Sequence, residues 1–326
     1  NFSQEDNRMI RSLRLKKNRI SKKNILSGKK NLSLYLLIMP AVIYVILLHY
    51  MPIFGLFIAF KDYNSYQGIF GSPWAGMMGF EHFITFIKLP NFWLIMRNTL
   101  ILSVYSIVLN TVLPIILALF INEIRSKIFK KTVQTISYAP YFISTVVVVG
   151  MLFSFCDVES GILNSIGAIF GIEAINLMES AFWFPTIYVV SGLWQGLGWW
   201  AIIYIGTLAN VDQSLHEAAV LDGAGRLKRI WYVNVPVILP MAIIMFIMSL
   251  GNMLSVGFEK VYLMQTSANL TTSEIISTYV YRVSLMAKIP QYSYATAIGL
   301  FNSVINIILL ITANFISRKV SATSLW

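Results

Sequence analysis

The sequence predicts an all-α integral membrane protein with six membrane-spanning helices. Of its 326 residues, 57% are hydrophobic and 12% are charged, whereas soluble domains have roughly 45–50% apolar and 25% charged residues. So few charges cannot cover a surface that faces water. The apolar residues gather in separate blocks of about 20 residues, the length that a helix needs to cross the hydrocarbon layer.

A basic segment at 1–31 holds much of the formal net charge of +11. Nucleic acid is one partner that such a charge suggests, but a bare run of like charges is weak evidence for it. Apolar blocks follow at once, and basic segments beside a span stay on the cytoplasmic side and are attracted to anionic lipid. The segment is therefore predicted to be cytoplasmic, with no nucleic-acid partner. A lipid-attracted arm at the membrane surface is favoured, and a helix packed against partner proteins is the alternative.

Six apolar blocks follow the basic segment, and we expect one span at each. The first block is expected to be a retained helix, because Lys61 and Asp62 follow it instead of a small-residue cleavage site. The predicted membrane domain is 32–316, and 317–326 is a short cytoplasmic tail. The six spans are expected at about 32–59, 97–121, 136–155, 183–208, 235–254 and 292–316.

Loop charges predict the orientation of the spans. Positive charge is retained on the cytoplasmic side of a membrane. The loop 156–182 has acidic residues and no lysine or arginine, so it is expected outside. The loops 122–135 and 209–234 and the tail are expected inside, which makes both termini cytoplasmic. Their basic residues are Arg125, Lys127, Lys130, Lys131, Arg226, Lys228, Arg229, Arg318 and Lys319.

The loop 209–234 has the pattern of a short capped helix. Asp212 or Ser214 could cap its start, and Glu217 is expected in its first turn, where negative charge is favourable. Gly223 would allow a left-handed turn at its end. An ordinary amphipathic helix at the membrane surface is the alternative, which the basic flanks would equally support.

The same loop resembles the EAA loop of ABC-importer permeases. The match consists of Glu-Ala-Ala, three residues, glycine, and then an aliphatic-proline pair at 235–236. Val233 and Val235 replace the commoner isoleucine and leucine, with little change of shape. The resemblance implies a coupling helix between the fourth and fifth spans, held in a groove of a separate ATPase. Its matching positions are Glu217, Ala218, Ala219, Asp222 and Gly223.

The resemblance extends over nearly the whole chain to sugar permeases of the maltose-importer type, especially those for oligosaccharides from plant or algal polysaccharides. It includes His-Tyr-Met-Pro at 49–52, Gly-Ser-Pro-Trp at 71–74 and Val-Gly-Phe-Glu-Lys-Val-Tyr at 256–262. It implies a multi-pass protein of the bacterial cytoplasmic membrane. The implied partners are a second homologous permease subunit, two ATPase subunits that hold ATP and Mg, an extracytoplasmic binding protein and an oligosaccharide.

A sugar path needs aromatic faces for stacking and amides or hydroxyls that replace water. Gln195 and Trp199 lie four residues apart in the fourth predicted span and so share one helix face. The interfacial aromatic belt is the alternative for the tryptophans, and Trp200 especially could face lipid. By resemblance, Gln195, Trp199, Asn252 and Glu259 are the candidate substrate-path residues.

Four further polar residues lie in the second and sixth predicted spans, and the sequence allows two roles for them. They could line the same path, or they could form inter-helical hydrogen bonds. These residues are Asn110, Thr111, Asn302 and Asn306.

Enzyme motifs are missing from the sequence. It contains no Gly-x-x-x-x-Gly-Lys-Ser/Thr phosphate loop, so ATP hydrolysis is expected in a separate subunit, with no cofactor in this chain. Cys156 is the single cysteine, which excludes an internal disulfide framework. An ion-coupled secondary carrier and an importer for another polar solute are the remaining alternatives. A secondary carrier is expected to have a buried acidic residue for ion coupling and inverted repeats. The sequence shows neither feature.

Overall fold

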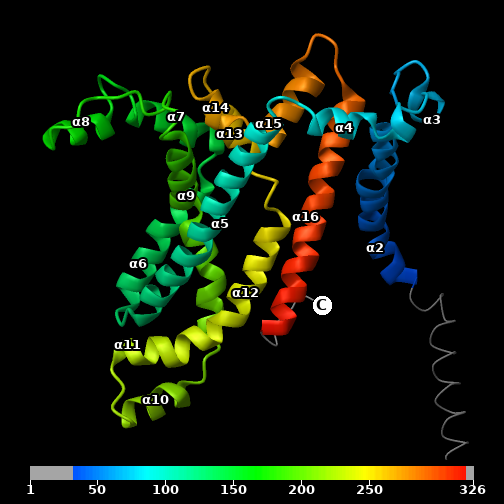
Figure 1. Cartoon of the computed structure of the whole chain (residues 1–326). Coiled ribbons are helices and arrows are strands. Elements are labelled where there is room, and N and C mark those ends of the chain that lie inside the picture. The colour runs from blue at the N-terminus through cyan, green and yellow to red at the C-terminus, as the bar shows by residue number, and fades with distance from the viewer. Residues whose placement is uncertain (1–31, 321–326) are drawn as a thin grey trace, which may run out of the picture. The chain divides into compact units, whose positions relative to one another are not determined.

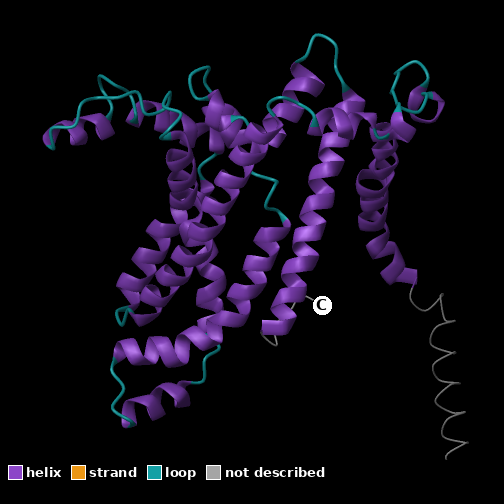
Figure 2. Cartoon of the chain, viewed as in Figure 1, coloured by secondary structure: helices purple, strands orange, loops and turns teal. Residues whose placement is uncertain are grey.

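The computed structural model describes residues 32–320, and every regular element in that range is a helix (Figure 2). An isolated bridge between Lys61 and Trp74 is the single strand-like pairing among the described residues. The all-helical class is confirmed. The chain divides between Phe57 and Ile58 into two compact units. The predicted basic segment 1–31 and residues 321–326 of the predicted tail lie outside the described residues.

The first unit contains the start of the first predicted span. Helix α2, Leu32–Val45, continues through a π-helical turn at Ile46–Tyr50 and a 3-10 helix at Met51–Phe60. Together these elements form an apolar helix of 27 residues, Leu34–Phe60. Proline lacks the amide hydrogen that an α-helix uses, and the helix type changes next to Pro52 for that reason.

Four long helices form the body of the second unit (Figure 1). They are α5, Phe92–Glu123; α9, Phe184–Leu208; α12, Val235–Gly251; and α16, Tyr292–Val320. Helix α5 lies against α9 along much of its length, and α12 lies against both of these helices and against α16. They correspond to the second, fourth, fifth and sixth predicted spans.

Length and composition identify four described helices that could cross a membrane: Leu34–Phe60, Phe92–Glu123, Arg226–Gly251 and Tyr292–Lys319. Helix α9 has 25 residues but is not among them, because glycines and aromatic residues replace the aliphatic ones of the other helices. A bent helix pair would be a fifth span. Six spans therefore remain a prediction.

The third predicted span, 136–155, is not one helix, and that prediction is wrong in its geometry. Helix α6, Lys127–Tyr138, and the 3-10 turn Ala139–Phe142 meet α7, Thr145–Phe155, at an angle of 98°. Pro140 lies in the 3-10 turn, and Ser144 begins α7 by accepting a hydrogen bond from Val147 N at 3.4 Å. A capped helix start inside the apolar block divides it in two.

Short helices occupy the predicted loops. At one end of the second unit, α10 (Gln213–Leu221) precedes α11 (Arg226–Arg229), which continues through a π-helical turn (Ile230–Asn234) into α12. The helix at the fifth predicted span thus begins earlier than predicted, at Arg226. We call this end the α10 end. The opposite, α13 end holds α3 (Gly68–Gly71), α4 (Glu81–Ile87), α8 (Ile162–Ile169), α13 (Phe258–Met264), α14 (Leu270–Ser273) and α15 (Ile276–Tyr281) (Figure 1).

Buried clusters of apolar side chains hold the helices of the second unit together. Towards the α10 end, Ala118 of α5 and Ala201 of α9 are fully buried beside Ala242 of α12. Small residues allow helix backbones to approach closely inside a membrane. Towards the α13 end, larger side chains such as Phe86 and Ile298 fill the space between α4 and α16.

Candidate functional site

A polar cavity lies inside the second unit, between α5, α9 and α12. Two hollows of about 420 and 330 Å³ share five polar or aromatic lining residues and so adjoin each other. We call them together the inner cavity. Oxygen and nitrogen groups are expensive inside a membrane bundle unless they serve a polar path. The shared residues are Ser106 and Asn110 of α5, Trp200 of α9, Ser249 of α12, and Asn252.

A break in the helices forms one wall of this cavity. Helix α12 ends at Gly251, and the chain runs as a loop until α13 begins at Phe258 (Figure 2). Ser103 Oγ donates to Met253 O, and Asn306 Oδ1 accepts from Leu254 N at 3.0 Å. Irregular backbone is tolerated at membrane depth where it lines a cavity. Asn306 of α16 thus bonds to the loop that follows α12, and neither of the two roles predicted for it is tested by this contact.

A lysine completes the wall. Lys260 is 8% exposed and lines the larger hollow. Its Nζ donates to Tyr188 O at 3.2 Å and lies 5.4 Å from the centroid of the Tyr188 ring. Burial lowers the pKa of Lys260 to about 8, because an apolar surrounding disfavours the charged form. The ammonium is therefore still predominantly charged at neutral pH.

Two predicted path residues, Gln195 and Trp199, face away from the inner cavity. Gln195 Nε2 donates to Ile143 O at 2.7 Å, at the bend between α6 and α7. Trp199 stacks on Tyr141, with centroids 4.3 Å apart and planes at 4°. The two side chains do share one face, as their spacing predicts, but that face contacts the bend. Their role in a substrate path stays a prediction without a cavity contact.

The other two predicted path residues are separated by the structure. Asn252 lines both hollows, whereas Glu259 is exposed and lines neither. In the short helix α13, Lys260, Val261 and Met264 are buried, which turns Glu259 outward because adjacent residues differ by about 100° around a helix. The spacing of Lys260 and Met264 at i and i+4 was the signal in the sequence that could have identified Lys260.

The structure places four further polar or aromatic residues in different surroundings. Trp200 lines both hollows instead of facing lipid alone, and Asn110 lines both as well. Thr111 lines the smaller hollow. By contrast, the side-chain oxygen of Asn302 is buried without a hydrogen-bond partner in the described structure.

The predicted capped helix is present as α10. Asp212 Oδ1 accepts from Ser214 N at 2.9 Å, so Asp212 is the cap, and this bond is the largest cause of the lowered pKa of the Asp212 carboxyl. Gly223 has φ +74°, as the predicted left-handed turn requires. Glu217 lies beyond the first turn, because α10 begins at Gln213, so that part of the prediction is wrong.

No residue of α10 is buried. Leu221 at its end is 87% exposed, and Leu227 in α11 is 82% exposed. The predicted coupling positions are likewise accessible: Glu217, Ala218, Asp222 and Gly223 are exposed, and Ala219 is half-buried. Large exposed apolar side chains such as these are available for contact with another protein.

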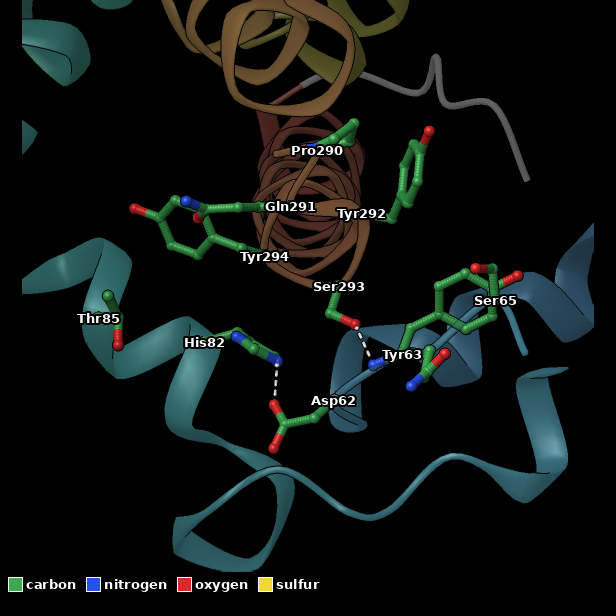
Figure 3. Close-up of a pocket in the computed structure, with 11 residues that line it drawn as sticks. Asp62, Tyr63, Ser65, His82, Thr85, Pro290, Gln291, Tyr292, Ser293 and Tyr294 are labelled. Atoms are coloured by element: carbon green, nitrogen blue, oxygen red, sulfur yellow. Dashed lines mark hydrogen bonds and ion pairs between the residues drawn. The ribbon is translucent and has the colours of Figure 1, made fainter. Parts of the chain in front are cut away.

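A second polar pocket, of about 660 Å³, lies at the α13 end beside the start of α16 (Figure 3). His82 Nε2 lies 3.2 Å from Asp62 Oδ1, and Ser293 Oγ accepts from Tyr63 N at 2.9 Å (Figure 3). These bonds join the pocket's own walls. The bond between Tyr63 and Ser293 therefore connects the chain after the first predicted span to α16.

Long apolar helices around a polar cavity, with an exposed helix at one end, define a helical membrane transport subunit. Residues 110–322 match the sequence profile of the binding-protein-dependent transport system inner membrane component family. The chain belongs to this family, as its sequence motifs predict. It is a multi-pass protein of the cytoplasmic membrane, and its family comprises transporter permeases, not catalytic enzymes.

Two curated relatives and a solved structure are similar to most of this chain. The polygalacturonan/rhamnogalacturonan transport system permease protein YteP of Bacillus subtilis is 41% identical over 88% of each chain. Protein LplB of Bacillus subtilis is 40% identical over 89% of this chain and 90% of its own. A solved bacterial alginate ABC transporter, in complex with alginate pentasaccharide-bound periplasmic protein, has a chain with TM-score 0.83 and 34% identity, covering 91% of this chain and 98% of that one. This chain is a sugar permease of the ABC transporter class.

Proposed function

We propose that this chain is a pore-forming subunit of an ATP-driven importer that translocates an oligosaccharide derived from a plant or algal polysaccharide. An extracytoplasmic binding protein delivers the sugar, and a second homologous permease subunit completes the pore. Two separate ATPase subunits bind ATP and Mg and hydrolyse the nucleotide. The relatives and the solved alginate transporter with its periplasmic protein support this assignment.

The observation on which the proposal depends is the exposed helix α10. Its N-terminus is capped by Asp212, its C-terminus turns at Gly223, and none of its residues is buried in this chain. A helix that is ordered by its own caps and offers Leu221 to the surroundings suits docking into a groove of another protein. In this role, closure of the ATPases moves α10 and, through α11, the membrane helix α12.

The proposal includes a six-span topology with both termini in the cytoplasm. It requires α9 to be the fourth span, although its composition is less apolar than that of the other long helices. The basic residues Arg226, Lys228 and Arg229 follow α10 in sequence, which supports a cytoplasmic α10 end by the positive-inside rule.

A glycine pair tests the coupling role of α10. Gly223 has φ +74°, and Gly225 has φ −67° with nothing within 4 Å of an added Cβ. A left-handed conformation costs about 1–2 kcal/mol for a residue with a Cβ, so Gly223→Ala distorts the end of α10 and Gly225→Ala does not. In the complete complex in lipid nanodiscs, we expect Gly223→Ala to reduce sugar-stimulated ATPase activity by about five-fold or more. Gly225→Ala should match wild type.

Each assay is run with and without the binding protein and with candidate oligosaccharides. Stimulation of the ATPase activity by one sugar-loaded binding protein identifies that sugar as the cargo. Stimulation by another polar solute, and by none of the sugars, would identify that solute as the cargo instead. Equal activity of the two variants, with equal complex assembly, would refute coupling through α10. Transport that needs no ATPase subunit would favour an ion-coupled secondary carrier.

A further inference from the structure

The cationic group of Lys260 is buried at the wall of the inner cavity without an acidic partner. The described residues form two ion pairs, His82 with Asp62 and Arg282 with Glu274, and Lys260 belongs to neither. None of the residues that line the inner cavity has a carboxylate. A buried charge is expensive unless it is paired. The position of Lys260 thus requires a compensating interaction.

The structure supplies that compensation in part. An ammonium group has three donors, and Tyr188 O accepts one of them at 3.2 Å. The Tyr188 ring, with its centroid 5.4 Å from Nζ, adds a cation–π interaction of modest strength. Two donors remain for another acceptor. Lys260 lines the larger hollow, so an acceptor inside the cavity can reach it.

The backbone of α9 leaves room for the ammonium. A Cβ added at Gly192 would lie 3.4 Å from Lys260 Nζ, and Gly192 lines the same hollow. The ammonium therefore rests against bare helix backbone instead of a side chain. This arrangement keeps the charged end close to the cavity and its aliphatic stem in the apolar core, where Val261 and Met264 are also buried.

The remaining lining groups suit a sugar. Hydroxyls and amides such as Ser249, Asn110 and Asn252 can replace the water that hydrates sugar hydroxyls, and Trp200 offers an aromatic ring. These hydrogen-bonding groups and the aromatic ring are sufficient to bind a neutral sugar. The ammonium adds a charge that attracts a carboxylate and forms a charge-assisted hydrogen bond with it.

We infer that Lys260 is the residue with which this permease selects acidic sugars, its ammonium binding the carboxylate of a uronate residue in the inner cavity. The inference rests on the proposed import function and narrows its substrate class. Lys260 is then a specificity residue within the path, acting after delivery by the binding protein. A structural lysine, by contrast, would hold the start of α13 against α9 and would not distinguish acidic from neutral sugars.

Direct binding to the complete permease–ATPase complex in nanodiscs, without binding protein, tests the inference. The probes are trigalacturonate and its fully methyl-esterified form, which have the same sugar backbone and differ in the charge of their carboxyl groups, with one small methyl group added at each. We expect the wild type to bind the acid at least about ten-fold more tightly than the ester. Lys260→Met removes the charge at similar volume and should bind both equally. Lys260→Arg should restore part of the preference.

Removal of an unpaired buried charge should not unfold the protein, and binding of the ester by Lys260→Met checks its integrity. If that variant cannot be recovered, Lys260→Gln serves in its place. An unchanged preference for the acid in the neutral variant would overturn the inference, as would equal binding of both probes by the wild type. If Lys260 pairs with a carboxylate of the second permease subunit, its charge is not available to the sugar. The wild type would then bind both probes equally, or the neutral variant would keep the wild-type preference. Import of neither probe by the wild type, in the presence of its binding protein, would instead refute the proposed function for these sugars.

A pH series supplies a readout that a structural lysine would not move. The pKa of Lys260 is about 8, so its charge, and with it the acid-to-ester preference, should fall as the pH rises from 7 to 9. Uronate carboxylates stay ionised throughout this range. Tyr188 is the other titratable lining residue, α7 offers no titratable side chain, and Glu259 and the tyrosines of α13 and α15 lie outside the lining. A preference that stays constant from pH 7 to 9 would contradict a role for the ammonium.

Discussion

Single glycines determine how closely the helices of this permease approach each other. A Cβ built at Gly198 of α9 would lie 2.2 Å from Ser137 O and 2.8 Å from the Tyr138 ring of α6. The first of these atoms belongs to the backbone and cannot turn away. Gly206, eight residues further along α9, has nothing within 4 Å of an added Cβ. Gly198 thus lies at a close contact between α9 and α6, whereas Gly206 does not.

Gly198→Ala should therefore destabilise the protein by about 1–3 kcal/mol, because α6 and α9 must separate to admit the methyl group. Gly206→Ala is the matched control on the same helix and should be neutral or slightly stabilising, since alanine has the higher helix propensity. Thermal unfolding of both variants in nanodiscs measures the difference. Equal Tm values for the two would show that α6 and α9 do not touch at this position.

At the scale of elements, the bend between α6 and α7 is held by a side chain of another helix. Ile143 lies between the 3-10 turn Ala139–Phe142 and α7, and its carbonyl accepts from Gln195 Nε2 of α9. Trp199 covers the same turn by stacking on Tyr141. A bend within an apolar segment leaves backbone groups without helical partners, and a neighbouring side chain can satisfy them.

Gln195→Leu should lower the stability by about 1–2 kcal/mol, because the Ile143 carbonyl loses its partner. Thr207→Val on the same helix is the control: Thr207 Oγ1 bonds within α9, to Ile203 O. Tm and sugar-stimulated ATPase activity are measured for both variants. A loss of sugar response by Gln195→Leu at unchanged Tm would instead place Gln195 in the substrate path, as its sequence position suggests.

At the scale of the whole molecule, the topology depends on α9. Four described helices qualify as spans by length and composition, and the bent pair α6 and α7 would be a fifth if it forms one span. Helix α9 leads from the loop that contains Glu173 to the α10 end, which contains Lys228 (Figure 1). If α9 crosses the membrane, these two exposed residues lie on opposite sides of it.

Cysteine labelling in intact cells decides this point, because Cys156 is the single cysteine of the chain. In a Cys156→Ala background, Glu173→Cys should react with a membrane-impermeant maleimide from outside. Lys228→Cys should react only after the cells are permeabilised. The unchanged background is the control for other reactions. Labelling of both positions from outside would exclude α9 as a span and, with it, the six-span topology.

The sequence alone predicts the all-helical class, the position of most apolar helices and the capped helix α10, because these follow from local composition. Gly223 is an example: its left-handed turn is required by the end of its own helix. The family resemblance likewise depends on motifs that are contiguous in the chain. Such features need no knowledge of which helices are neighbours.

Tertiary structure alone shows which helix faces meet. It turns Lys260 inward and Glu259 outward, brings Trp200 to the inner cavity while Trp199 contacts Tyr141, and bends the third predicted span. Helices that are apolar on all sides have no polar stripe from which to predict their orientation. The polar residues within them therefore acquire their roles only when the neighbouring helices are in place.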